Sequence, residues 1–166
     1  MQNWFECKIK YQKINEYGQE KPVAESYLVD ALSFTEAESR LIKMLETELS
    51  EDFIVTGITK AKLEEVIPFE GADYWYKCKV VYKDIDEKSG KEKATQHQVL
   101  VAADDFKAAF ENVSKSQEQV LVPWEIQQIA LTKIVDVFPY EVDDEGENEN
   151  NLTDEDVNYI SDKAVE

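Results

Sequence analysis

Two short segments of the chain combine an aromatic ring with nearby lysines, and such a combination can bind a nucleic-acid strand. Alternation along a strand places these side chains on one face: Trp4, Lys8 and Lys10 in the first segment, and Trp75, Lys77 and Lys79 in the second. Bases stack on flat rings at roughly 1–3 kcal/mol each, while ammonium groups follow the phosphates. Single-stranded nucleic acid is therefore the first candidate ligand.

A structural explanation of the same two rows stays open. Lysines on a solvent-facing sheet are ordinary, and Trp4 and Trp75 would equally well pack between the two segments. Glu6 interrupts the first row and reduces its positive charge. The sequence does not decide whether the rows are exposed or packed.

The residue types needed for catalysis are scarce. His97 is the sole histidine, and we find no glycine-rich phosphate loop, no nucleophile motif and no metal-type spacing. Cys7 and Cys78 occupy strand-like segments, so we expect buried, reduced thiols, with a disulfide between them as the alternative. We expect a non-enzymatic protein without a cofactor.

The chain has nearly the same pattern twice. WFECKIKY, beginning at Trp4, returns as WYKCKVVY, beginning at Trp75, at an offset of 71, and later apolar positions match at 71 or 72. The offset predicts two tandem ββαβ repeats, 1–70 and 71–138, in a pseudo-symmetric α+β domain with antiparallel sheets. A unit of about seventy residues is marginal alone, so we expect the halves to share a core or a sheet.

Local patterns place the elements within each repeat. Phe5, Cys7 and Ile9 alternate towards one face, which the helices should cover, as should the equivalent face of the second repeat. Ser33 begins the first helix, and Asp104 or Asp105 begins a shorter second helix.

The spacing of apolar residues also indicates where the third strand of each repeat is irregular. It slips from two to three residues in each of these strands, which predicts bulges at Thr56–Gly57 and Gln127–Gln128. Whether the segments ending at Ile67 and Phe138 form fourth strands stays open.

The last segment, 139–166, differs in character from the rest. It has eleven acidic residues and one lysine, so we expect a disordered acidic tail with a short helix over 153–164. Val157, Ile160 and Ala164 share one side of that helix and could bind a partner protein. In many single-strand binders such tails also compete for the basic face.

The tail supports other functions as well. A protein-binding adaptor or inhibitor is the alternative to nucleic-acid binding. An acidic mimic of nucleic acid is a weaker one, because most of the excess charge lies in the tail.

Charge and hydropathy narrow the kinds of ligand and the cellular compartment to expect. The net charge is −18, and Arg40 is the sole arginine, which argues against bidentate clamping of phosphates. No apolar run approaches the roughly 20 residues that span a bilayer, and no signal segment begins the chain. We expect a cytoplasmic protein that does not bind membranes.

The segments WFECKIKY and SYLVDALSFTEAESR resemble an uncharacterised family of small proteins from gut-type bacteria and their phages, a domain of unknown function. The resemblance covers residues 3 to about 138 and is specific at Trp4, Cys7, Tyr27 to Ala37, and Trp75. It implies a compact α+β domain and an association with phages. It brings no catalytic residues.

Overall fold

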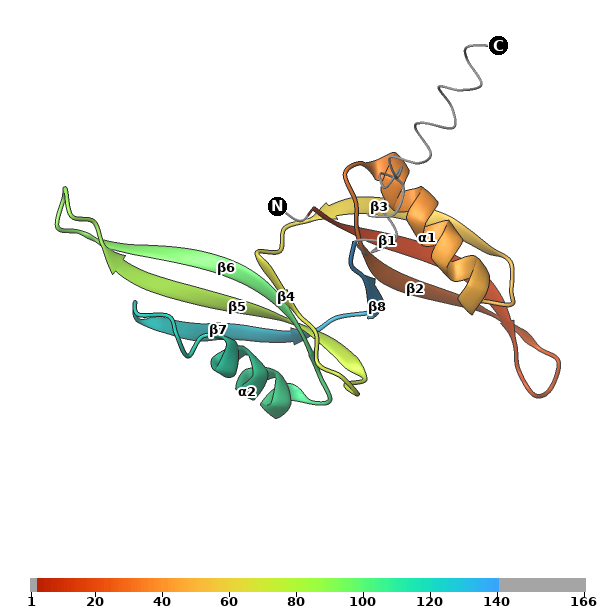
Figure 1. Ribbon diagram of the computed structural model, residues 1–166. Helices are drawn as coiled ribbons and strands as arrows, with labels where there is room; N and C mark the ends of the chain where they lie inside the picture. The colour runs from red at the N-terminus through yellow and green to blue at the C-terminus, as the bar shows by residue number, and fades with distance from the viewer. Residues whose placement is uncertain (1–2, 141–166) are drawn as a thin grey trace, which may run out of the picture.

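A computed structural model describes residues 3–140 of the chain, which form eight strands and two helices (Figure 1). The α+β class is confirmed. In chain order the elements are β1 (Trp4–Ile14), β2 (Glu20–Asp30), α1 (Phe34–Glu48), β3 (Phe53–Ala61), β4 (Glu65–Ile67), β5 (Tyr74–Ile85), β6 (Glu92–Ala103), α2 (Phe106–Ser116), β7 (Trp124–Leu131) and β8 (Ile134–Phe138). The expected acidic tail and its helix over 153–164 lie outside the described residues.

The strands form two four-stranded sheets, in the orders β3-β1-β2-β8 and β4-β6-β5-β7. Most neighbours are antiparallel, but β8 runs parallel to β2, and β4 runs parallel to β6. The expectation of purely antiparallel sheets is therefore corrected. The parallel pairs arise because β4 and β8 form after the chain has crossed from one sheet to the other.

The two fourth strands exchange between the sheets. β4 begins four residues after β3 ends, yet it pairs with β6 of the other sheet. β8 likewise begins three residues after β7 ends, and it pairs with β2 (Figure 1). Each sheet is thus completed by a strand from the other half of the chain, so the two halves share their sheets.

Each sheet buries one face against one helix, as the alternation of apolar residues predicts. Cys7 and Ile9 of β1 are fully buried with Leu41 and Leu45 of α1. The corresponding cluster of the second sheet contains Tyr76, Cys78, Val80, Val99, Val101, Ala103, Ala109 and Val113. The predicted orientation of both thiol rows is confirmed.

Side-chain caps begin both helices. The Ser33 hydroxyl accepts from the Glu36 amide at 3.1 Å, and the Asp105 carboxylate accepts from the Ala108 amide at 2.7 Å. Such caps satisfy backbone donors that a helix leaves without partners and contribute about 1 kcal/mol each. Of the two aspartates considered for the second cap, Asp105 is the N-cap.

The predicted bulges are also confirmed. Along β3 the register shifts at Thr56, which has no partner on β1, and along β7 it shifts at Gln127, which has none on β5. A bulge increases the local twist of a strand. Both bulges lie in edge strands: β3 next to β1, and β7 next to β5.

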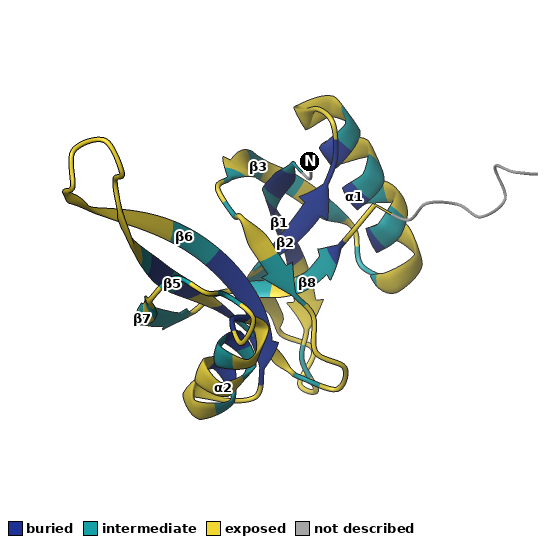
Figure 2. Cartoon of the chain, turned by 60° about the vertical axis from the view of Figure 1, so that its left-hand side comes forward, coloured by how far each residue is buried: buried dark blue, intermediate teal, exposed yellow. Residues whose placement is uncertain are grey.

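A third core lies between the sheets. Trp4, Leu28 and Leu100 are buried there, and their exposed fractions are 4%, 0% and 1%. Half-buried residues around them are Ala61, Leu63, Val66, Trp75, Ile134 and Val137. Buried residues lie under both helices as well as where the sheets meet, whereas the hairpin tips are exposed (Figure 2). We call this cluster the junction core.

The junction core predicts a matched pair of stability effects. Leu28→Ala and Leu100→Ala should each lower the free energy of unfolding by about 2–5 kcal/mol, because each leaves a cavity. Leu121 is 99% exposed, so Leu121→Ala should change it by no more than about 0.5 kcal/mol. Urea unfolding measures all three. Either junction variant behaving like Leu121→Ala would contradict the described packing.

Candidate nucleic-acid interface

The junction of the two sheets opens into a cleft of about 540 Å³. Its lining residues are Glu6, Lys8, Ser26, Leu28, Thr59, Lys60, Ala61, Lys62, Leu63, Lys77, Leu100, Thr132, Lys133 and Ile134. Five of these are lysines and one is a glutamate. We call this cavity the lysine cleft. Its volume falls within the range of about 300–1,000 Å³ that is usual for ligand sites.

Both sheets contribute to the lysine cleft. Lys8 lies on β1 opposite Ser26 and Gly57, whereas Lys77 lies on β5 opposite Leu100 and Ala130. The cleft therefore exists only when the two sheets are joined.

The connections that carry the chain between the sheets supply two further lysines. Lys62 lies between β3 and β4, and Lys133 lies between β7 and β8. These two positions match at the offset of 71. Crossing from one sheet to the other therefore places one lysine of each half at the same cleft.

The floor and walls of the cleft mix apolar and hydroxyl groups. Leu28 and Leu100, which are fully buried in the junction core, reach the cleft from below. Thr132 is held in place because its hydroxyl donates to the Trp75 carbonyl at 2.8 Å and accepts from the Ile134 amide at 3.3 Å. This anchoring fixes the backbone next to Lys133.

No acid of residues 3–140 forms an ion pair with a lysine of the cleft. Within residues 3–140 the one ion pair closer than 4.0 Å joins Lys83 to Glu125, which lie outside the cleft. Glu6 is the single carboxylate of the lining. Since the protein as a whole carries −18, five lysines around one cavity form a local positive site on an acidic body. Such a site suits an anion.

The six residues predicted to bind nucleic acid do not all meet. Lys8 and Lys77 line the lysine cleft, and they come from different sheets. Lys10 is exposed and Lys79 is half-buried, and neither lines it. The lysine rows therefore contribute one member each.

The tryptophans require a correction. Trp4 is only 4% exposed, so its place in a solvent-facing nucleic-acid site is wrong, and the alternative explanation, packing between the two segments, is confirmed for it. Trp75 is half-buried. Their face of the sheet was identified correctly, but that face is covered by the other sheet in the junction core. A ring that is buried in this way offers no free face to a base.

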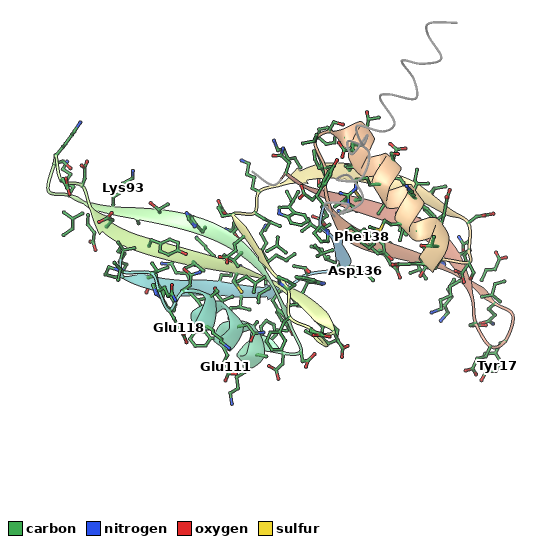
Figure 3. All side chains as sticks on the ribbon, viewed as in Figure 1. Tyr17, Lys93, Glu111, Glu118, Asp136 and Phe138 are labelled. Atoms are coloured by element: carbon green, nitrogen blue, oxygen red, sulfur yellow. The ribbon has the colours of Figure 1, made fainter. Side chains whose placement is uncertain are left out.

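Both tryptophans line a second cavity, of about 400 Å³, at the other end of the junction. Its other lining residues are Val66, Pro68, Asp136, Val137 and Pro139. We call it the Trp–Pro pocket. β8 connects the two cavities, since Ile134 lines the lysine cleft and Val137 lines the Trp–Pro pocket. Figure 3 shows Asp136 and Phe138 on this strand, which is the edge strand of the first sheet.

Three cleft residues were missed by the sequence argument: Lys60, Lys62 and Lys133. A signal for two of them was present, because Lys62 and Lys133 match at the same offset as the rest of the repeat. Lys62 and Lys133 lie outside the regular strands, so period-two alternation could not assign their side chains to a face.

The remaining predicted groups are structural or lie elsewhere. His97 packs edge-on against Tyr82 at 4.8 Å, and residues 3–140 contain no cluster of three metal-ligating side chains. The predicted partner-binding residues Val157, Ile160 and Ala164 lie outside the described residues and stay a prediction.

Both cysteines are free, buried thiols, as expected. Burial, with a smaller contribution from the charges of Glu6 and Glu38, raises the pKa of Cys7 from its usual 9.0 to about 12. Burial alone raises the pKa of Cys78 to about 11. Neither thiol is therefore an activated nucleophile.

The chain belongs to the family described as Domain of unknown function (DUF4494), which matches residues 3–140. This confirms the expected membership of a family of unknown function, while bacterial and phage origin stay predictions. No curated protein and no solved structure matches the chain. Within residues 3–140, neither α1 nor α2 could span a bilayer.

The raised pKa of Cys78 predicts how stability depends on pH. Its contribution is fully present below pH 9, the usual thiol pKa, and is lost as the pH rises towards about 11, because the unfolded thiol ionises first. Between pH 8 and about pH 10.5, unfolding free energy should fall by roughly 1–2 kcal/mol less in Cys78→Ala than in the unmodified protein. Urea unfolding at the two pH values measures this. An equal fall in both proteins would show that the thiol is not desolvated.

Proposed function

Starting from a family of unknown function and from the geometry of the lysine cleft, we propose that this protein is a non-enzymatic binder of single-stranded nucleic acid. The observation that carries the proposal is the convergence of five lysines, from both sheets and both crossing connections, on one cavity. No carboxylate of residues 3–140 lies within 4.0 Å of these ammonium groups. Since residues 3–140 leave these ammonium groups without a paired carboxylate, the cleft suits a chain of phosphates.

The mode of binding follows from the residue types. Lysine acts as a point charge that follows a backbone, and it does not read bases in the bidentate way of arginine. Trp4 has no free face for stacking, and Trp75 is only half exposed. We therefore expect contacts mainly to the phosphate backbone, weak dependence on sequence, and strong dependence on salt.

Duplication of one ancestral unit is part of the same proposal. Several matched features support it: Phe34 packs edge-on against Phe5 at 4.9 Å, and Phe106 packs edge-on against Tyr76 at 5.0 Å. The strand orders β3-β1-β2-β8 and β7-β5-β6-β4 also correspond element by element. Under this proposal the lysine cleft arose when two copies of the unit joined.

Binding of a protein is the second candidate function, and the Trp–Pro pocket favours it. This cavity is lined mainly by apolar side chains and is open to solvent at Pro68 and Pro139. In this alternative the protein is a phage-associated, cytoplasmic adaptor or inhibitor. The Val157, Ile160 and Ala164 stripe would then be a further contact.

The proposal predicts the effect of removing the two matched lysines of the crossing connections. In Lys62→Gln/Lys133→Gln, affinity for a labelled oligothymidine of about 12 nucleotides should fall roughly tenfold or more at low salt. The slope of log affinity against log salt should fall by about 1 for each lysine that contacts a phosphate. Fluorescence anisotropy measures both quantities. The chain should be tested in full and ending at Tyr140.

A matched control comes from the first hairpin. Lys13 and Lys21 are exposed, lie opposite each other on β1 and β2, and do not line the cleft. Lys13→Gln/Lys21→Gln removes the same charge and should leave affinity within about twofold of the unmodified protein. If both double variants lose affinity equally, the binding depends on net charge alone. If neither form of the unmodified chain binds at low salt, the proposal is wrong.

A further inference from the structure

We propose that residues 141–149 of this same chain bind in the lysine cleft and compete there with nucleic acid. The inference names an internal regulator of the proposed binding site, and its regulatory part rests on the proposed function. Its first support is charge. The segment 141–149 contains six acidic residues and no basic one, whereas the cleft has five lysines and one glutamate. The Trp–Pro pocket and a cavity between α1 and β3 have no lysine in their lining, and a cavity at the β5–β6 hairpin tip has two.

The second support is the place where the described chain ends. Arg40 of α1 donates through Nη2 to the Pro139 carbonyl at 3.0 Å, and its guanidinium lies 4.7 Å from the centre of the Tyr140 ring. These contacts fix the origin of the segment at the end of β8. The beginning of β8, at Ile134, lines the lysine cleft. The segment therefore begins one short strand away from the site that we propose it occupies.

The reach is sufficient. β8 has five residues, which correspond to about 17 Å of strand at roughly 3.3 Å per residue. Nine residues of extended chain span up to about 30 Å. β8 is an edge strand, so a chain leaving Tyr140 can pass around this edge to the face that holds the cleft. To return along β8 to the cleft, the segment 141–149 needs about half of its extended length.

The tether makes such a contact effective even where it is weak. A segment joined to its site by a short flexible linker has an effective concentration in the millimolar range. Occupancy of the cleft for nine-tenths of the time would reduce the apparent affinity for an oligonucleotide about tenfold. The attraction should weaken as salt increases, because the Debye length falls to about 3 Å at 1 M.

A spin label tests the contact without any nucleic acid. Cys7 and Cys78 are buried and have raised pKa values, so a thiol introduced by Gly146→Cys in the full chain can be labelled selectively. Backbone amide signals near Lys62 and Lys133 should broaden at low salt and recover at about 1 M salt. Signals near Lys93, close to the far hairpin tip, should stay sharp (Figure 3).

Two outcomes of the labelling experiment would overturn the inference. One is equal broadening across the molecule, and the other is a pattern confined to another surface. Adding Lys62→Gln/Lys133→Gln to the labelled protein should reduce the broadening at the remaining cleft residue Lys77. If it does not, the segment is held by something other than the lysines.

Charge neutralisation tests the competition. D143N, D144N, E145Q, E147Q and E149Q together should raise affinity for oligothymidine about tenfold at low salt. The matched control neutralises five acids further along: D154N, E155Q, D156N, D162N and E166Q. It should change affinity by about twofold or less, and an equal gain in both variants would contradict a specific role for 141–149. Because the spin-label experiment contains no oligonucleotide, it can succeed even if the proposed function fails, and oligonucleotide binding can be found even if the contact is absent.

Discussion

The exchange of β4 and β8 is the constraint on which the rest of the structure depends. Each short strand pairs with the long hairpin of the other half of the chain. The face of each sheet that its helix leaves uncovered is buried where the two sheets meet. Leu28 and Leu100 are at most 1% exposed for this reason. A half separated from the other would lack one strand of its sheet. It would also expose its own leucine, Leu28 or Leu100, at a cost of about 2 kcal/mol or more in lost burial alone.

The same exchange produces the candidate site. The connections that cross between the sheets are only two or three residues long, so their lysines cannot lie far from the junction. Lys62 and Lys133 are thereby added to Lys8 and Lys77, which the faces of β1 and β5 bring from opposite sheets. An otherwise acidic molecule thus has a positive cavity at the place where its two halves join. The lysine cleft therefore forms only when the two halves of the fold come together.

Local patterns predicted most of the elements, because short-range physics determines them. Period-two alternation identified the buried row around Cys7, the Ser33 cap began α1, and the slip in apolar spacing located the bulge at Thr56. Alternation says which side chains share a face, but it does not say what covers that face. The sequence therefore left open whether Trp4 faces solvent or packs between the halves, and the structure shows that the other sheet buries it. The sequence also did not predict the partners of β4 and β8, because these strands of three to five residues pair with strands far away in the sequence.

The central claim is that the lysine cleft holds an anionic chain, and protection of lysines from acetylation tests it most directly. Full-length protein carrying D143N, D144N, E145Q, E147Q and E149Q, in which the proposed competing segment is neutralised, is treated with a limiting amount of acetylating reagent, with and without oligothymidine. Modification at each lysine is measured by mass spectrometry. The account predicts that the five cleft lysines are protected by the oligonucleotide: Lys8, Lys60, Lys62, Lys77 and Lys133. Lys13, Lys93 and Lys107, which are exposed and lie outside the cleft, should not be protected. Protection of the second group, or of no lysine, would contradict it.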